Sequence, residues 1–202
     1  MGTKERIALG AQELFFRFGI RRITMDEIAN HLGVSKKTIY GSFKDKEELV
    51  LYLIKAKLKG DKHDFTCIQQ DAKNIVDEVF CIMSRMSELF SKINPVIFYD
   101  LQKFHPKAWQ LFKDFKGEFI LGIVEKMIVK GIKDKLVRSD VNPKIFARLR
   151  MEEIEMGFNP EVFPIDKFKL IEVQLALAEH FLYGICTLKA YKMIESYKKN
   201  MI

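Results

Sequence analysis

The feature that most constrains this chain is the stretch from Thr24 to Phe43, TMDEIANHLGVSKKTIYGSF, which carries the signals of two short helices joined by a tight turn. Thr24 and Glu27 match a Thr-x-x-Glu capping box, which predicts a helix start. Gly33 stands where a residue in the left-handed conformation would end that helix. Ser35 can cap a second helix immediately afterwards. The stretch therefore predicts a helix-turn-helix.

The second helix of this pair has an unusual first turn, because it begins with Lys36 and Lys37. The positive end of the helix macrodipole disfavours each exposed cation there by roughly 0.3 to 1 kcal/mol. A helix selected only for stability would have acidic residues at these positions. Two lysines, unpaired backbone N–H groups and nearby hydroxyls describe a surface suited to a polyanion, and the major groove of duplex DNA admits a helix. The alternative is a solvated helix of an unrelated α-helical protein.

Composition and charge set wider limits. The chain has 202 residues and is 48% hydrophobic, which favours a folded protein with a sizeable core. The net charge is +7, but residues 1–50 hold nine Lys or Arg against seven Asp or Glu, a net of +2. DNA binding is therefore argued from where the basic residues lie, and only weakly from the net charge.

The three cysteines are far apart in the sequence and form no C-x-x-C pair. This indicates buried free thiols in a reducing compartment, with redox sensing as the less favoured alternative. The N-terminal segment lacks the pattern of a signal peptide, and no stretch approaches the ~18 uninterrupted apolar residues of a membrane span. We expect a cytoplasmic protein without a membrane partner.

Apolar residues recur at three- and four-residue intervals along the rest of the chain, and no alternation typical of a strand is present. The sequence therefore predicts an all-α fold. Besides the helix-turn-helix, helices are expected over residues 4–18, 45–60, 66–93, 95–105, 109–128, 143–155 and 166–191.

Several motifs in the first fifty residues occur in a specific order: Phe18-Gly19, Thr24-x3-Ile28-Ala29, Gly33-Val34-Ser35-x2-Thr38-x-Tyr40-x2-Phe43 and Lys46-x2-Leu49. Their order and spacing resemble the N-terminal signature of TetR/AcrR-type transcriptional regulators. The resemblance implies an all-α homodimer. Its N-terminal three-helix helix-turn-helix DNA-binding domain would be residues 1–46, and a larger C-terminal helical domain, residues 47–202, would bind a ligand and form the dimer.

The resemblance and the polar surface together give the candidate DNA-binding residues. They are Thr24, Ser35, Lys36, Lys37, Thr38, Tyr40, Ser42 and Lys46. The chain departs from the pattern at Gly41 and Ser42, where many relatives have larger residues such as His or Tyr. This departure leaves the operator sequence open.

The interval from Phe65 to Phe119 is rich in aromatic residues and methionine. Such side chains at helical spacing most often form plain core, but as a cluster they would also line an apolar pocket. The resemblance implies that such a pocket binds an inducer. The candidate pocket residues are Phe80, Met83, Met86, Phe90, Phe98, Tyr99, Trp109, Phe112 and Phe119.

The last predicted helix interleaves small residues with large apolar ones. Gly184 within it costs about 1 kcal/mol relative to Ala, so a close helix approach is expected to offset that cost. The resemblance implies a four-helix dimer interface made from this helix and the 143–155 helix of each protomer, whereas the alternative is an ordinary intramolecular core contact. The candidate interface residues are Phe146, Leu149, Leu177, Phe181, Gly184, Ile185 and Leu188.

Catalytic and metal-binding motifs are not found in the sequence. The four histidines have no H-x3-H or Cys/His spacing, no serine lies in a nucleophile elbow, and no Gly-rich phosphate loop is present. We therefore expect no enzyme activity, no metal and no cofactor.

The function that the sequence favours is a dimeric, ligand-responsive regulator. It would be a repressor on a palindromic double-stranded DNA operator, released by a small apolar or amphipathic effector. Dimerisation would let two N-terminal DNA-binding domains reach successive major grooves about 34 to 36 Å apart. The alternative is an activator or nucleoid-associated factor without a small-molecule inducer.

Overall fold

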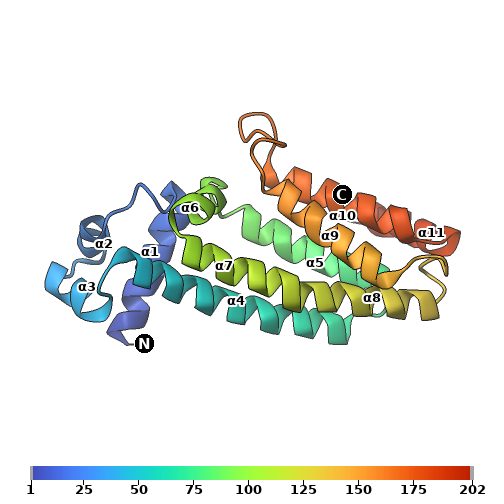
Figure 1. Cartoon of the computed structure of the whole chain (residues 1–202), viewed down its shortest axis with the longest axis horizontal. Coiled ribbons are helices and arrows are strands. Elements are labelled where there is room, and N and C mark those ends of the chain that lie inside the picture. The colour runs from blue at the N-terminus through green and yellow to red at the C-terminus, as the bar shows by residue number, and fades with distance from the viewer. Residues whose placement is uncertain (1, 201–202) are drawn as a thin grey trace. The chain divides into compact units, whose positions relative to one another are not determined.

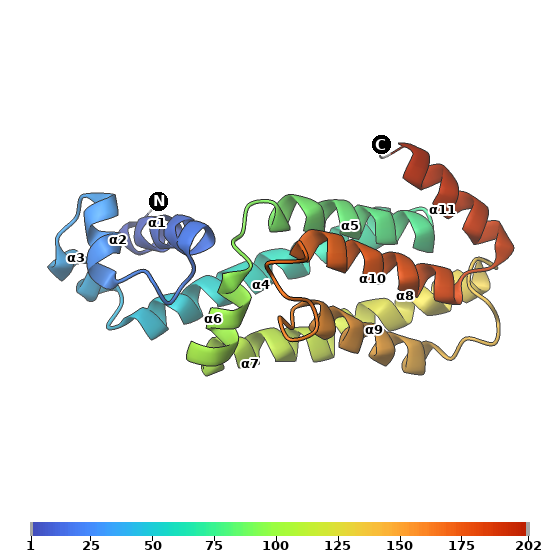
Figure 2. The ribbon, with the colours of Figure 1, turned by 90° about the horizontal axis from the view of Figure 1, so that it is seen from above.

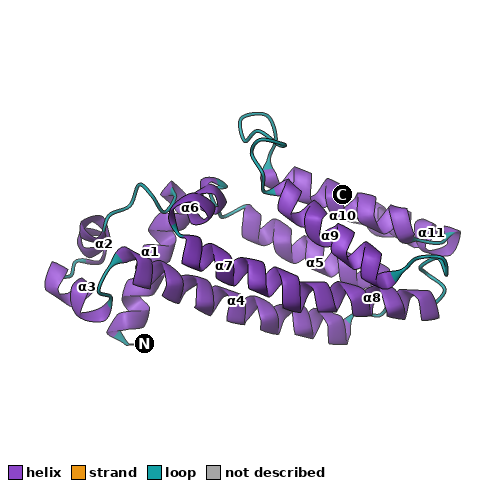
Figure 3. Cartoon of the chain, in the orientation of Figure 1, coloured by secondary structure: helices purple, strands orange, loops and turns teal. Residues whose placement is uncertain are grey.

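The computed structural model describes residues 2–200, and most of these residues are helical (Figure 3). Within this range no β-strand forms, and β-type pairing is limited to an isolated bridge between Val137 and Cys186. The predicted all-α fold is confirmed. No helix in the described range is both long enough and apolar enough to span a bilayer.

The helices follow one another along the chain as labelled in Figure 1. They are α1 (Thr3–Phe18), α2 (Met25–Leu32), α3 (Lys36–Ser42), α4 (Lys46–Asp71), α5 (Ile75–Phe90), α6 (Val96–Phe104), α7 (Pro106–Asp114), the π-helix η1 (Phe115–Ile120), α8 (Leu121–Lys133), α9 (Pro143–Gly157), α10 (Leu170–Ile185) and α11 (Leu188–Asn200).

The helices form two compact units. The first unit consists of Met1–Asp61 and Phe90–Asp114, and the second of Lys62–Leu89 and Phe115–Ile202. The first unit thus includes α6 and α7 in addition to the predicted DNA-binding domain. The functional boundary at residue 46 stays a prediction, because compactness does not test where DNA binding ends.

The first unit is built on close packing between α1 and α2. Ile7, Ala11 and Phe15 of α1 are buried, as are Ile28 and Ala29 of α2. Gly10 makes this packing possible, since a Cβ at that position would lie 2.5 Å from Leu32 Cδ2. The two helices therefore form a base on which α3 rests.

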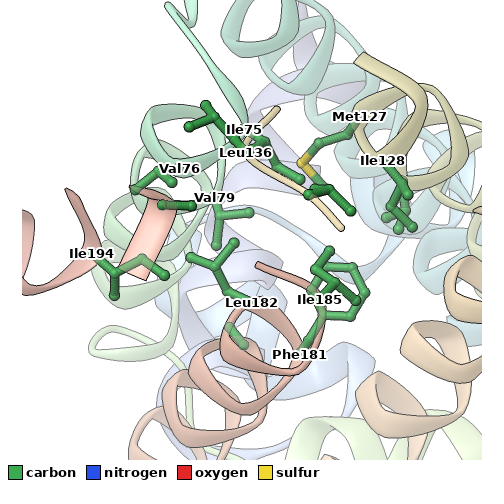
Figure 4. Close-up of a cluster of buried hydrophobic side chains, with 14 of the residues drawn as sticks. Ile75, Val76, Val79, Met127, Ile128, Leu136, Phe181, Leu182, Ile185 and Ile194 are labelled. Atoms are coloured by element: carbon green, nitrogen blue, oxygen red, sulfur yellow. The ribbon is translucent and has the colours of Figure 1, made fainter. Parts of the chain in front are cut away.

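The second unit has one continuous apolar core, and Figure 4 shows labelled side chains of α5, α8, α10 and α11 gathered in it, together with Leu136. α9 packs against both α8 and α10, as Figures 1 and 2 show. The labelled core residues are Ile75, Val76, Val79, Met127, Ile128, Leu136, Phe181, Leu182, Ile185 and Ile194.

Two predicted helix boundaries are wrong. α4 continues through Gly60 to Asp71, and α5 begins only at Ile75, because the Asn74 carboxamide accepts hydrogen bonds from Val76 N at 3.0 Å and Asp77 N at 3.1 Å. An N-terminal cap of this kind fixes where a helix starts.

The last predicted helix is in fact two helices, since α10 ends at Ile185 and α11 starts at Leu188. The break coincides with backbone hydrogen bonds from Arg138 N to Ile185 O and from Thr187 N to Leu136 O, both 2.9 Å. These bonds satisfy groups at the helix ends through a segment distant in sequence, which no local signal indicates.

Among the described residues, Glu78 of α5 is the most deeply buried acidic or basic side chain of the second unit. Only 1% of it is exposed, and its Oε1 has no hydrogen-bond partner among the described residues. Burial raises the pKa of this carboxyl group to about 7, against the opposing effects of the Lys130 charge and a hydrogen bond with Gln69. The native state therefore favours the protonated form at pH values where the unfolded chain is ionised.

We expect Glu78→Gln to stabilise the protein in a pH-dependent way. Because the pKa is higher in the folded state, the stability that Glu78 contributes is complete below its unfolded pKa and is lost as pH rises through 7. The substitution should raise the free energy of unfolding by about 3 kcal/mol at pH 8 and by less than about 1 kcal/mol at pH 5. Urea unfolding at fixed protein concentration measures both values, and an equal gain at the two pH values would contradict the assignment.

Candidate nucleic-acid interface

The start of α2 is fixed by the predicted capping box. Thr24 Oγ1 accepts a hydrogen bond from Glu27 N at 3.1 Å, and Thr24 N donates to Glu27 Oε2 at 2.7 Å. The hydrogen bond from the Thr24 backbone N–H, with a second from its hydroxyl, lowers the pKa of Glu27. The side chain of Thr24 is thus held at the first turn of α2 in a defined orientation.

The turn between α2 and α3 also matches its sequence signals. Gly33 has φ +63° and ψ 36°, and Val34 N bonds to Ala29 O at 3.0 Å, so the left-handed ending of α2 is confirmed. Ser35 caps α3 by accepting a hydrogen bond from Thr38 N at 3.1 Å. The hydroxyls of Ser35 and Thr38 lie 2.9 Å apart.

α3 buries little of its own surface. Of its seven residues only Ile39 is buried, whereas Lys36, Lys37, Tyr40 and Gly41 are exposed. Exposed residues at positions i and i+4 lie on one face of a helix, so these four form two adjacent stripes on the outer side of α3. We call this surface, with its cap Ser35, the α3 outer face.

The two lysines of the α3 outer face differ in their surroundings. Lys36 forms an ion pair with Asp26 of α2, which raises the pKa of the lysine, yet 66% of its side chain remains exposed. Lys37 takes part in no ion pair recorded among residues 2–200. Both ammonium groups can therefore be reached from outside the protein, although Asp26 partly neutralises one of them.

Two of the predicted residues are more involved in the protein's own structure. Ser42 is half-buried and its hydroxyl donates to Thr38 O at 3.3 Å. Lys46 is also half-buried, donates from Nζ to Arg21 O at 3.3 Å, and lies 5.9 Å from the centroid of the Phe15 ring. Burial lowers the pKa of Lys46. Its ammonium is thus partly occupied within the first unit.

Basic side chains outside the predicted set lie just before α2. The Arg21 guanidinium lies 4.6 Å from the centroid of the Phe104 ring, and that of Arg22 lies 5.5 Å from the centroid of the Phe18 ring. Both residues are exposed. Their position close to Thr24 in the sequence is the signal that could have placed them among the predicted DNA-binding residues.

The predicted pocket residues fall in both compact units. Phe90, Phe98, Tyr99, Trp109 and Phe112 belong to the first unit, where Trp109 stacks on Phe112 with centroids 5.1 Å apart. Phe80, Met83, Met86 and Phe119 belong to the second unit. Phe80 and Met83 are buried in its core, and Phe80 stacks on Tyr197. Their role in ligand binding stays a prediction.

The predicted dimer residues divide into buried and exposed members. Phe181 and Ile185 are buried in the protomer's own core, whereas Leu149 is 49% and Leu188 84% exposed. A Cβ added to Gly184 would meet nothing within 4 Å, so no contact within the protomer explains this glycine. The exposed members are the ones available to a partner.

Metal binding finds no support in the described residues, where no group of three His, Cys, Asp or Glu side chains is arranged to hold an ion.

Comparison with known proteins gives matches to transcriptional regulators. Residues 7–53 match the family described as "Bacterial regulatory proteins, tetR family". The uncharacterised HTH-type transcriptional regulator YvaF of Bacillus subtilis is 25% identical over 166 residues, which cover 80% of this chain and 85% of YvaF. The matched family segment contains the whole helix-turn-helix.

The similarity to solved structures covers nearly the whole chain. A transcriptional regulator from Cytophaga hutchinsonii has a TM-score of 0.69 at 24% identity, covering 91% of this chain and 98% of that one. The SmeT–triclosan complex has a TM-score of 0.72 at 16% identity, covering 94% of each chain. At these identities the likeness concerns the fold.

We expect Thr24→Ala to destabilise the protein, because it removes the acceptor for Glu27 N at the start of α2. The expected loss in the free energy of unfolding is about 1 kcal/mol, and Thr24→Ser, which keeps the hydroxyl, should lose much less. Urea unfolding compares the three proteins. Equal stability of the Ala variant and the native protein would show that the cap does not contribute.

Proposed function

We propose that the chain is a TetR/AcrR-type helix-turn-helix transcriptional regulator that acts as a ligand-responsive repressor on a palindromic DNA operator. The α3 outer face carries this proposal. Its lysines remain accessible although the local helix dipole disfavours them, and a duplex offers the phosphates and groove that would compensate. A protein that bound no polyanion would gain stability from acidic residues at the same positions.

In this proposal the predicted residues take different roles. Lys36, Lys37 and Tyr40 extend from the α3 outer face towards bases and phosphates, and Thr24, Ser35 and Thr38 present hydroxyls at the two helix starts. The polar atoms of Ser42 and Lys46 bond to Thr38 O and Arg21 O within the protein, and a DNA contact from either residue would have to share or replace that bond.

We further propose that the protein acts as a homodimer formed through α9 and α10. The two helices pack together, and α9 presents Ile145 and Leu149 to solvent. Gly184 on α10 is exposed with open space above it, and Leu188 at the start of α11 is exposed as well. A second copy would cover this apolar surface and would bring a second head to the next major groove.

The proposed effector is a small apolar or amphipathic molecule. Its support is the aromatic and methionine content of the candidate pocket residues, together with the fold that the chain shares with SmeT, whose structure contains triclosan. Release from DNA would follow if the effector binds a conformer with altered head spacing better than the DNA-binding conformer.

A DNA-binding factor without an inducer is the second candidate. The burial of Phe80 and Met83 in the core of the second unit favours it, because a filled interior leaves those side chains no ligand to contact. Thermal unfolding with and without triclosan as a probe separates the two candidates, since a ligand that binds the native state raises the unfolding temperature.

We expect Lys36→Ala and Lys37→Ala, alone and combined, to weaken binding to duplex DNA without lowering the unfolding temperature. Each lysine that contacts a phosphate contributes close to one unit to the dependence of log affinity on log salt concentration. The double variant removes four such lysines from a homodimer, so the slope per bound dimer should be smaller by about four. Fluorescence anisotropy over a series of salt concentrations measures the affinity and the slope.

Asp26→Asn is the matched control for the Lys36 variant. It breaks the same ion pair as Lys36→Ala but keeps the cation, so its affinity for DNA should equal or exceed that of the native protein. The α3 assignment is refuted if the double lysine variant binds DNA as tightly as the native protein at every salt concentration.

We expect Gly184→Leu to disrupt the dimer, because a large side chain would occupy space that the second copy needs. Sedimentation velocity should show monomers or misassembled species. Gly60→Leu is the control, since Gly60 is also helical, exposed and open, but lies on α4 outside the proposed interface. A Gly184→Leu protein that sediments as the native dimer would place the interface elsewhere.

A further inference from the structure

The connection between α1 and α2 is held at the backbone of one residue, Arg21, through both its N–H and its carbonyl group. Its N–H donates to Asp100 Oδ2 of α6 at 2.8 Å, and its carbonyl accepts from Lys46 Nζ of α4 at 3.3 Å. Arg21, Lys46 and Asp100 all belong to the first unit. Two helices that follow the helix-turn-helix in the sequence therefore bond to the residue that lies three positions before the α2 cap.

Asp100 is an unexpected residue for this position, since only 3% of it is exposed. A buried carboxylate is costly unless hydrogen bonds and opposite charge compensate it. Here the compensation comes from the Arg21 N–H and from the nearby positive charge of Lys46, which Asp100 attracts. The backbone N–H of the connection thus supplies a hydrogen bond that offsets part of the cost of burying the Asp100 carboxylate.

The connection is shaped to admit this carboxylate. Gly19 has φ +83°, a conformation that favours glycine, and a Cβ there would lie 3.0 Å from Asp100 Oδ2 and 3.2 Å from Val96 Cγ1. Both the backbone conformation and the close approach of α6 therefore require glycine. α6 is seated directly against the end of α1.

Asn94, two residues before the start of α6, bonds to the end of α1. Asn94 N donates to Phe16 O at 2.7 Å, and Asn94 Nδ2 donates to Arg17 O at 3.4 Å. These are carbonyls of the last turn of α1, which have no partner within their own helix. The segment from Asn94 to Asp100 thereby bonds to both the end of α1 and the connection that leads to α2.

We propose that Asp100 is a positioning residue for DNA binding, acting through its hydrogen bond with the Arg21 N–H. By fixing the backbone at Arg21 it sets the direction in which the chain enters α2, and with it the orientation of the α3 outer face. The proposal rests on the proposed DNA-binding function. Asp100 lies outside the helix-turn-helix, 57 positions after Phe43, yet in this proposal it affects the orientation of the α3 outer face.

The test compares Asp100→Leu, which removes the acceptor and keeps most of the volume, with Asp100→Asn, which keeps an acceptor oxygen. Asp77→Ala is the matched control, because the Asp77 carboxylate also accepts a backbone N–H, that of Lys73 at 2.9 Å, but lies in the second unit. The probe is the duplex that the native protein selects from random fragments, and affinities are measured at fixed salt well below every unfolding temperature.

Asp100→Leu should bind the selected duplex about tenfold more weakly, whereas Asp100→Asn and Asp77→Ala should remain within about twofold of the native protein. In the free protein the Arg21 amide should exchange with solvent faster in Asp100→Leu only. If that variant does not fold, Asp100→Ala replaces it in both measurements.

Native-like DNA binding by the variant lacking the acceptor would overturn the positioning role while leaving the proposed function intact. An equal loss in Asp77→Ala would also overturn it, since the effect would then be one of general stability. Failure of the native protein to bind any duplex would instead overturn the proposed function and this inference with it.

Discussion

The proposed DNA-binding head depends on how a helix too short to be stable alone is held in place. α3 has seven residues, far fewer than the roughly 12 to 15 that an isolated helix needs even to be marginal in water. It is fixed by the Ser35 cap at its start, by buried Ile39 and by buried Phe43 at its end. Because one side chain within the helix anchors it, most of the others are available for contacts outside the protein.

Local stability and recognition are separated along this segment. The capping box of Thr24 and Glu27 fixes the start of α2, and the left-handed conformation of Gly33 fixes its end. Neither feature uses the exposed side chains of α3. Asp26 offsets part of the cost of Lys36 in the free protein, and phosphates would compete for the same ammonium in a complex. The backbone N–H and carbonyl of Arg21, bonded to Asp100 and Lys46, then connect the helix-turn-helix to α6 and α4.

The sequence was most informative where structure is set by neighbours in the chain. Caps and turns involve residues two to four positions apart, so Thr24, Gly33 and Ser35 could be assigned correctly. The Lys36 pair with Asp26, the Lys46 bond to Arg21 and the break between α10 and α11 depend on residues ten or more positions away, and no local pattern encodes them. Apolar spacing likewise did not distinguish buried Ile185 from exposed Leu188, because both suit the same helical stripe.

The most direct test of the account is selection, by the 202-residue protein, of fragments from random duplex DNA at physiological salt. The account predicts enrichment of an inverted repeat whose half-sites lie about one helical turn, or a multiple of it, apart, because two α3 outer faces would read successive major grooves. The account would be contradicted if the selected fragments had the base composition of the starting pool and shared no sequence motif. The protein would then bind DNA without recognising its sequence.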